Sequence, residues 1–264
     1  MDRAAADPQL PASVRGRKPR FVAGIRAVVQ RELGGWFDAP VAWIALALAL
    51  FATSSWFLNE FFLANRLDLA PFFDRLPWVY VLLVPALAMR VWSEDLRART
   101  FELWMTLPLT PLQVVLGKYV GALVVLAAFL AGTLPIVAFL CTLGSPDLGR
   151  IAAGYAGAFL LGAQLLALGQ LLSALFADAL VAFLASAVLS AVLLAAGEER
   201  VVAVLDGLAP ALGGGRALAD VLSPLPRYGA FVGGSVGLAA VLWFAATAAA
   251  FLWANVRVAE RARS

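Results

Sequence analysis

The residues of this chain that could take part in binding or coupling are concentrated in one polar segment, residues 90–118, between two long apolar runs. The segment reads RVWSEDLRARTFELWMTLPLTPLQVVLGK. Its acidic and basic side chains are interleaved with Leu103, Trp104 and Met105, so it is neither a plain solvated linker nor a membrane span. We expect a cytoplasmic element that contacts both the membrane-embedded part of the chain and a separate protein. The alternative is an inert loop.

Residue types in the chain exclude catalytic chemistry that depends on histidine, on paired cysteines or on a phosphate-binding loop. The sequence has no histidine, which rules out Ser-His dyads, histidine proton relays and histidine-ligated zinc. Its single cysteine, Cys141, cannot form an intrachain disulfide. Gly117 and Lys118 lack the upstream glycine of a phosphate-binding loop and are followed by Tyr119. We therefore expect no catalytic residue, metal site or cofactor in this chain, and any driving energy must come from another protein.

The composition places the chain in a membrane. It is 62% hydrophobic and only 14% charged, with a mean hydropathy of +0.88. Soluble domains are about 45–50% apolar and about 25% charged, so lipid must solvate much of this surface. The net charge is only +3, and the basic residues cluster near the ends of apolar runs, which does not suggest nucleic-acid binding.

The predicted fold class is an all-α integral membrane protein with six transmembrane helices, because a bilayer-crossing helix needs about 20 mostly apolar residues. The candidate spans are residues 40–58, 77–92, 114–143, 151–176, 179–196 and 230–254. The second is short unless it begins within residues 71–76, and Pro135 should kink or tilt the third. The middle parts of the spans carry no Asp, Glu, Lys or Arg, and ionisable residues such as Arg90 and Lys118 lie near the span ends, which weakens the case for an ion-coupled carrier.

The parts of the chain outside the spans are of three kinds. Residues 1–20 are rich in Ala, Pro and Arg and are predicted to be a disordered cytoplasmic arm. The membrane domain is expected to comprise residues 21–258, and residues 259–264 are expected to form a cytoplasmic tail. Residues 21–37 have helical apolar periodicity and predict an interfacial amphipathic helix; a soluble amphipathic helix is the alternative. Residues 198–229 are too interrupted to span and predict an outer-surface or re-entrant helix.

The distribution of basic residues predicts the orientation. With the N-terminus inside, 14 of the 20 Lys and Arg residues fall in cytoplasmic segments and 6 fall outside. Cytoplasmic loops of membrane proteins carry the excess of basic residues. Both termini and residues 90–118 are therefore expected to be cytoplasmic.

Helix-start signals divide the polar segment into short elements. Ser93 can cap a short helix, and a break before Phe101 would allow a second one that Pro108 ends. Thr110 is placed as an N-cap with Pro111 at the first helical position and Gln113 at the capping-box position. Leu109 and Val114 occupy the positions of a hydrophobic staple. We expect a short cytoplasmic coupling helix between the second and third spans.

The polar segment also resembles a known family. Its series of Glu94, Asp95, Arg97, Thr100, Glu102, Leu103 and Pro108, followed by Gly117-Lys118, is similar to that of ABC-2 type transporter permeases, most of all the gliding-motility-associated branch. The likeness covers residues 21–258 in the number and order of spans, but only residues 90–118 are specific. Arg99 departs from the pattern, because family members commonly have glycine there, and Arg adopts a left-handed turn less readily.

The resemblance implies a permease subunit of an ATP-binding-cassette exporter in the bacterial inner membrane. Such permeases work as pairs, homodimeric or heterodimeric, with separate ATPase subunits that bind ATP and Mg²⁺. The residues implied in ATPase coupling are Glu94, Asp95, Arg97, Arg99, Thr100, Glu102, Leu103, Thr106 and Pro108. The sequence names no substrate. The alternative function is a non-transporting accessory subunit that anchors a membrane complex.

Small residues four apart predict close helix packing, either within the chain or between subunits. They are Gly117 with Gly121, Gly154 with Ala158 and Gly162, and Gly233 with Gly237. In the fourth span, Gln164, Gln170 and Ser173 are expected to form hydrogen bonds between helices in preference to substrate contacts.

Overall fold

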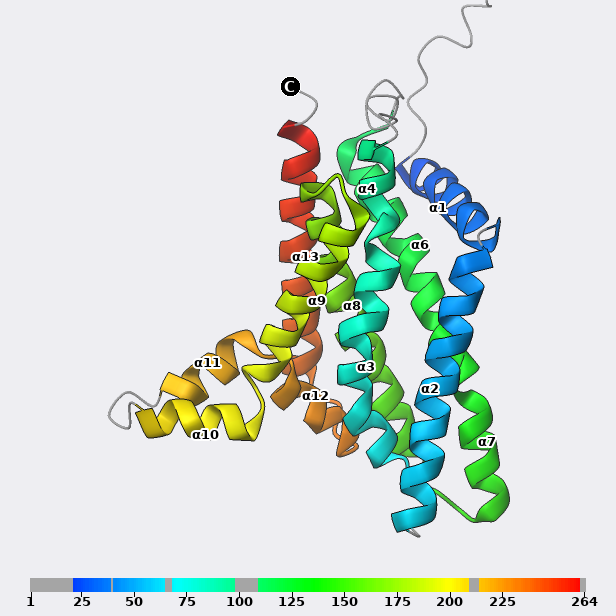
Figure 1. Ribbon diagram of the computed structural model, residues 1–264, viewed down its shortest axis with the longest axis vertical. Helices are drawn as coiled ribbons and strands as arrows, with labels where there is room; N and C mark the ends of the chain where they lie inside the picture. Colours follow the sequence, from blue (N-terminus) through cyan, green and yellow to red (C-terminus); the bar gives the residue numbers. More distant parts are fainter. Residues whose placement is uncertain (1–20, 39, 65–67, 98–108, 209–213, 262–264) are drawn as a thin grey trace, which may run out of the picture.

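The computed structural model describes residues 21–38, 40–64, 68–97, 109–208 and 214–261, which form helices and short connections without a β-strand among them. Long helices run side by side along the long axis of the molecule, and shorter helices lie at its two ends (Figure 1). In chain order the helices are α1 (Phe21–Asp38), α2 (Pro40–Ala64), α3 (Ala70–Ala88), α4 (Arg90–Arg97), α6 (Pro111–Gly132), α7 (Leu134–Leu143), α8 (Leu148–Leu175), α9 (Ala179–Ala195), α10 (Glu199–Leu208), α11 (Gly214–Leu222), α12 (Leu225–Val232) and α13 (Leu238–Arg261).

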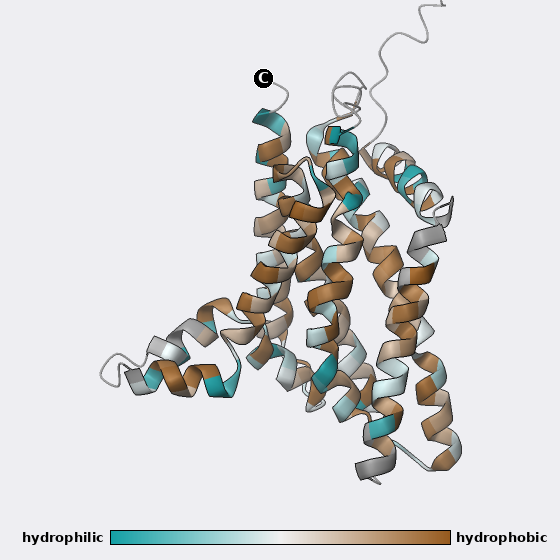
Figure 2. Ribbon diagram, viewed as in Figure 1, coloured by the Kyte–Doolittle hydropathy of each residue, from teal (hydrophilic) through white to brown (hydrophobic). Residues whose placement is uncertain are grey.

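Several of these helices are long and apolar enough to cross a membrane. Four segments meet that condition within the described residues, and a fifth is counted if α9 and α10, bent by 70°, form one span. The four are Ala70–Arg97, Pro111–Leu143, Leu148–Leu175 and Leu238–Arg261. In α2 the apolar stretch is shorter, Leu46–Asn59. Apolar residues cover most of the bundle (Figure 2), as expected for a multi-pass membrane protein, while the arrangement with six spans stays a prediction.

The second span is longer than its expected core of residues 77–92. It begins at Ala70 and continues through α4 to Arg97 after a break at Met89. The expectation that Ser93 caps a new helix is wrong, because α4 has already begun at Arg90. The buried Ser93 hydroxyl instead donates to the Met89 carbonyl four residues earlier, a bond that serine commonly makes inside a helix.

The third span begins as its sequence predicted. The Thr110 hydroxyl accepts from the backbone N–H of Gln113 (3.3 Å), and the Gln113 side chain accepts from the Thr110 N–H (2.8 Å), which completes a capping box. The span is interrupted at Thr133, between α6 and α7. Pro135 lies two residues later and has no N–H to continue the helical hydrogen bonds, which explains the interruption.

Helix α8 lies at the centre of the bundle and contacts α3, α4, α6, α9, α12 and α13. Two of its glycines lie at positions where a neighbouring helix approaches closely. A Cβ atom on Gly154 would lie 2.4 Å from the Phe73 ring of α3, and one on Gly162 would lie 2.6 Å from Leu126 of α6. Ala158, between them, is fully buried. This row of small residues is therefore covered by helices of the same chain.

The last span begins later than expected, at Leu238 instead of Ala230. Residues 225–232 form the separate helix α12, which packs on the bundle. Its Tyr228 hydroxyl donates to the Phe73 carbonyl (2.7 Å), and burial raises the pKa of this phenol. The chain then turns through Gly234, whose positive φ of 89° favours glycine. Gly233 and Gly237 lie in this connection, outside α13, so they are not the helix-packing pair that the sequence suggested.

Two short helices occupy most of the predicted outer segment of residues 198–229. Helices α10 and α11 pack against each other and project sideways from the bundle (Figure 1). The Gly215 N–H donates to Asp206 Oδ1 (2.8 Å), which joins them. Helices α1 and α4 and the last turns of α13 lie at one end of the bundle, whereas α7 and α10 to α12 lie toward the other (Figure 1).

Candidate functional site

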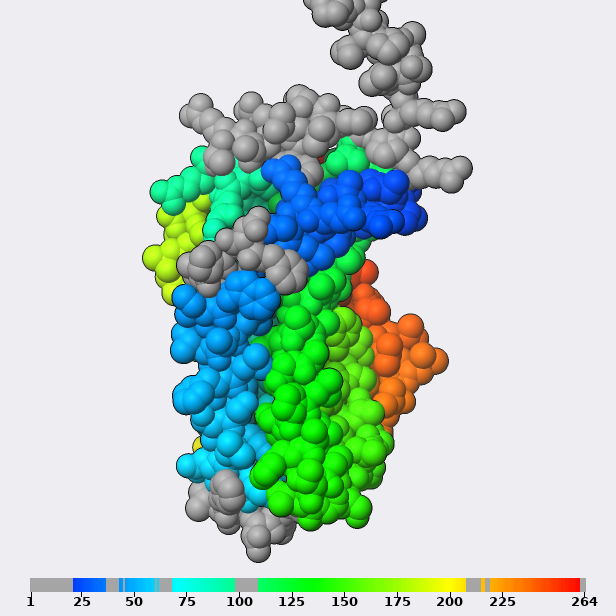
Figure 3. All heavy atoms as spheres, turned by 90° about the vertical axis from the view of Figure 1, so that its right-hand side faces the viewer, coloured from blue at the N-terminus to red at the C-terminus, as the bar shows by residue number. Residues whose placement is uncertain are grey.

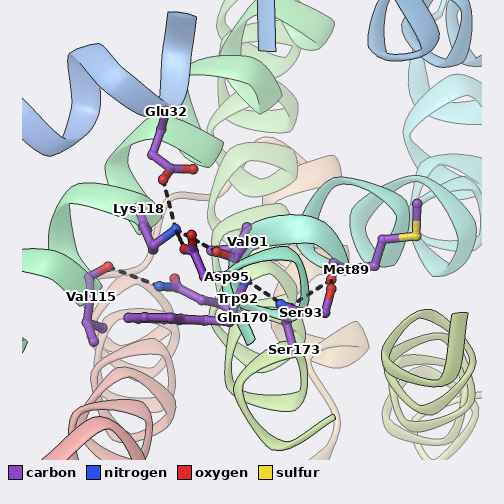
Figure 4. A network of polar contacts seen from close by, with 10 residues as sticks. All are labelled: Glu32, Met89, Val91, Trp92, Ser93, Asp95, Val115, Lys118, Gln170 and Ser173. Atoms are coloured by element: carbon purple, nitrogen blue, oxygen red, sulfur yellow. Dashed lines mark hydrogen bonds and ion pairs between the residues drawn. The ribbon is translucent and has the colours of Figure 1, made fainter. Parts of the chain in front are cut away.

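Lys118 is the centre of the candidate site, because its charged side chain is only 2% exposed. Its Nζ atom lies 2.8 Å from Glu32 Oε1 and 2.7 Å from Asp95 Oδ2, and it donates to the Val91 carbonyl oxygen (2.6 Å). The Trp92 ring centroid is 5.0 Å from Nζ. Figure 4 shows these groups converging on the ammonium. An ammonium has three donors, so three oxygen partners satisfy it and allow its burial.

The Lys118 cluster joins three helices that are distant in the sequence. Glu32 belongs to α1, Asp95 to α4 and Lys118 to α6. The Glu32–Lys118 contact connects residues 86 positions apart. We call these three residues the charged junction.

Helix α1 lies against α6 over several turns (Figure 3). The Gln113 side chain donates to the carbonyl of Phe21, the first residue of α1 (3.2 Å). A Cβ atom on Gly117 would lie 2.5 Å from the buried Val28, and Gly121 faces the next turn of α1. Gly117 and Gly121 therefore lie in a contact within the chain, which brings Glu32 close to Lys118.

Helix α4 is held from the other side by Ser173 of α8. The Ser173 hydroxyl donates to the Met89 carbonyl (2.9 Å) and accepts from the backbone N–H groups of Trp92 (3.0 Å) and Ser93 (3.2 Å). The first N–H groups of a helix have no partner within the helix. Ser173 thus caps N–H groups in the first turn of α4 from another helix.

A second hydrogen bond from α8 reaches α6. The Gln170 side chain donates to the Val115 carbonyl (3.0 Å), close to the charged junction (Figure 4). The prediction of hydrogen bonds between helices is confirmed for Gln170 and Ser173. It is not confirmed for Gln164, whose buried side-chain oxygen has no hydrogen-bond partner among the described residues. Helices α1, α4, α6 and α8 are therefore connected by polar contacts at one end of the bundle.

A cavity of about 240 Å³ lies between α1 and α4, beside Lys118. Gly35, Trp36 and Val91 form part of its wall. The charged residues of the wall are Arg31, Glu32, Arg90, Glu94, Asp95 and Lys118. They comprise three bases and three acids, so their formal charges balance. Arg90 and Glu94 form an ion pair one turn apart on α4, with side chains 41% and 55% exposed.

The structure separates the residues that the sequence assigned to ATPase coupling. Asp95 points into the protein and pairs with Lys118, whereas Glu94 and Arg97 are exposed on α4. The remaining six lie outside the described residues: Arg99, Thr100, Glu102, Leu103, Thr106 and Pro108. Their role in coupling stays a prediction.

Two members of the site were not singled out from the sequence, Glu32 and Trp92. Glu32 stands on a helix whose other charges near it are arginines, and Trp92 precedes the acidic pair in a segment that was expected to end the span. A lysine inside an apolar run, such as Lys118 among Val114, Val115 and Tyr119, was the available signal that a buried acidic partner was needed.

The arrangement holds α1, α4 and α6 together at one end of the bundle. Each charge of the junction is held by groups on other helices. Within the described residues, no group of three or more His, Cys, Asp or Glu side chains is placed to bind a metal ion. The chain matches no protein-family model, and a comparison with curated proteins gives no match.

Proposed function

We propose that this chain is the membrane-spanning permease subunit of an ATP-binding-cassette transporter of the ABC-2 type. It exports its substrate across the bacterial inner membrane with energy from a separate ATPase, which binds the ATP and Mg²⁺. It has six spans, both termini in the cytoplasm, and works with a second permease subunit. Residues 90–118 form the element that docks on the ATPase.

The observation that carries this proposal is the ion pair between Asp95 and Lys118. Helix α4 ends at Arg97 and α6 begins at Pro111, so the pair joins the two helices just before and after residues 98–108. A force that an ATPase applies to this segment therefore acts on two helices fastened together at a buried site. Without the pair, the same force could separate α4 from α6 and be lost as local deformation.

The contacts around this pair extend the effect to other helices. Glu32 attaches α1 to the same ammonium, and Ser173 attaches the central helix α8 to the start of α4. A force applied to residues 98–108 can thus be transmitted to helices on several sides of the bundle. Such a connection is what a permease needs, because it must convert ATPase movement into rearrangement of its spans.

The position of the junction supports a cytoplasmic docking element. Helices α1 and α4 and the last turns of α13 share one end of the bundle (Figure 1), and the excess of basic residues predicts that this end is cytoplasmic. Helix lengths support six spans: the 25 residues of α2 and the 17 of α9 correspond to about 38 Å and about 26 Å at 1.5 Å per residue. Both lengths are compatible with crossing a bilayer core of about 30 Å.

Purification of the tagged full-length chain from its own membranes in mild detergent tests this function. We expect an ATPase with a phosphate-binding loop to co-purify in stoichiometric amount, and the complex to hydrolyse ATP in the presence of Mg²⁺. The control is a complex whose ATPase lacks its phosphate-loop lysine: it should assemble but not hydrolyse ATP.

Two results would contradict the proposal. Specific ATP hydrolysis by the isolated chain would show an energy source that the sequence lacks. A stable complex that contains no ATPase would favour the accessory-subunit alternative.

A further inference from the structure

If the second candidate span enters the bilayer at Ala70, helix geometry places the cavity between α1 and α4 at the level of the lipid headgroups on the opposite side. The candidate span begins at Ala70, and the 20 residues from there to Arg90 rise about 30 Å, which is the thickness of the hydrocarbon core. Arg90 and Glu94 are therefore at the membrane surface when Ala70 is at the opposite one. Trp36, in the same wall, belongs to a residue type that is enriched at this depth.

The wall of the cavity selects for a ligand with no net charge but with separated charges. Its three basic and three acidic side chains balance, so neither a free anion nor a free cation is favoured by the summed field. The two charges of the Lys118–Asp95 pair are engaged deep in the wall. The Arg90–Glu94 pair is half exposed, and each of its members can exchange its partner for an opposite charge on a ligand.

We propose that this cavity binds the headgroup of a zwitterionic phospholipid that carries a primary ammonium group, of the phosphatidylethanolamine class. The phosphate lies beside Arg31 and Arg90, and the ammonium beside the carboxylate of Glu94. The volume of about 240 Å³ is far larger than the roughly 10–15 Å³ that one water molecule needs by the same measure, so the cavity accommodates the phosphate and ethanolamine atoms. The acyl chains extend along the bundle into the bilayer.

The chemistry of the site predicts which headgroups it rejects. A primary ammonium donates hydrogen bonds to a carboxylate, whereas the trimethylammonium group of phosphatidylcholine has no N–H to donate. An anionic headgroup such as phosphatidylglycerol brings a phosphate without the ammonium that Glu94 requires. This inference needs only that the bundle crosses a membrane, so it can fail or hold independently of the transport function.

Native mass spectrometry of the delipidated full-length protein in detergent tests the proposal. The probes are phosphatidylethanolamine, phosphatidylcholine and phosphatidylglycerol with the same acyl chains. We expect phosphatidylethanolamine to bind at least about tenfold more tightly than either of the others. Glu94→Gln should reduce its affinity to that of phosphatidylcholine, and Arg31→Gln should weaken both zwitterionic lipids.

The matched control is Arg257→Gln. Arg257 forms an exposed pair with Glu260 at the same end of the bundle, but on α13 and away from this cavity, so the variant should keep the lipid preference. Equal binding of the three lipids, or tighter binding of phosphatidylglycerol, would overturn the proposal. So would an unchanged preference in Glu94→Gln. If soluble glycerophosphoethanolamine binds as tightly as the lipid, the ligand is not a membrane lipid and the assignment is wrong.

Discussion

Replacement of Lys118 by methionine removes the charge at the centre of the junction and leaves a side chain of similar length. The carboxylates of Glu32 and Asp95 then remain close together without the ammonium that lies 2.8 Å and 2.7 Å from them. The Val91 carbonyl loses its donor as well. We therefore expect the protein to be destabilised at the end where α1, α4 and α6 meet.

The size of this effect follows from the burial of the three charges. Removal of one partner from a buried ion pair costs about 3–5 kcal/mol in the free energy of unfolding. The Glu32 and Asp95 side chains are 17% and 14% exposed, so water can reach them after the ammonium is removed. We therefore expect the lower end of this range, a loss of about 3 kcal/mol in the free energy of unfolding. At about 2–4 °C per kcal/mol for a chain of this size, the melting temperature should fall by about 6–12 °C.

Thermal unfolding of the purified protein in one detergent, followed by size-exclusion chromatography, measures this shift. The triple variant with Glu32→Gln and Asp95→Asn added should recover at least half of the loss, because no carboxylate is left without its ion-pair partner. Arg257→Met is the control: it breaks an exposed ion pair and should change the melting temperature by less than the error. A change of less than about 2 °C in Lys118→Met would refute the structural importance of the junction.

Three further predictions address the docking element, the α4 cap and the topology. Glu102→Ala should leave expression and topology intact but weaken ATPase association at least about thirtyfold, which corresponds to the loss of about 2 kcal/mol for a desolvated interface charge. The control Glu198→Ala should leave ATPase association unchanged. A pull-down titration of each variant with the ATPase measures the difference. Ser173→Ala should cost about 1–3 kcal/mol in thermal unfolding, because two buried N–H groups of α4 lose their acceptor. On a Cys141→Ser background, an impermeant thiol reagent added outside cells should label cysteines in α10 but not in α4.

The helix starts could be predicted where the signal lies within a few residues. Thr110 and Gln113 form their capping box whatever the rest of the chain does, because both partners are on the same turn. The start of α13 could not be predicted in this way. Residues 230–232 belong to the predicted apolar run, and hydropathy does not show that they end the separate helix α12, which Tyr228 attaches to α3 before the chain turns at Gly234.

The site could be located from the sequence but not assembled. The charge pattern of residues 90–118 identified the segment, yet Asp95 was assigned to the same outward role as Glu94. Asp95 is directed inward and Glu94 outward because they occupy different faces of α4, and because Lys118, 23 residues after Asp95, provides a buried partner for Asp95 but not for Glu94. Glu32 is further still, 86 residues from Lys118, and only the packing of α1 on the small residues of α6 brings the two together.

The central claim, that residues 90–118 receive the ATPase, is tested most directly by crosslinking in cells. A photoreactive amino acid is introduced at position 102, and at position 198 of the opposite end as the control. If the proposed function is right, position 102 crosslinks to an ATP-binding-cassette ATPase with a phosphate-binding loop, and position 198 does not. Absence of such a crosslink from position 102, or equal crosslinking from both positions, would contradict it.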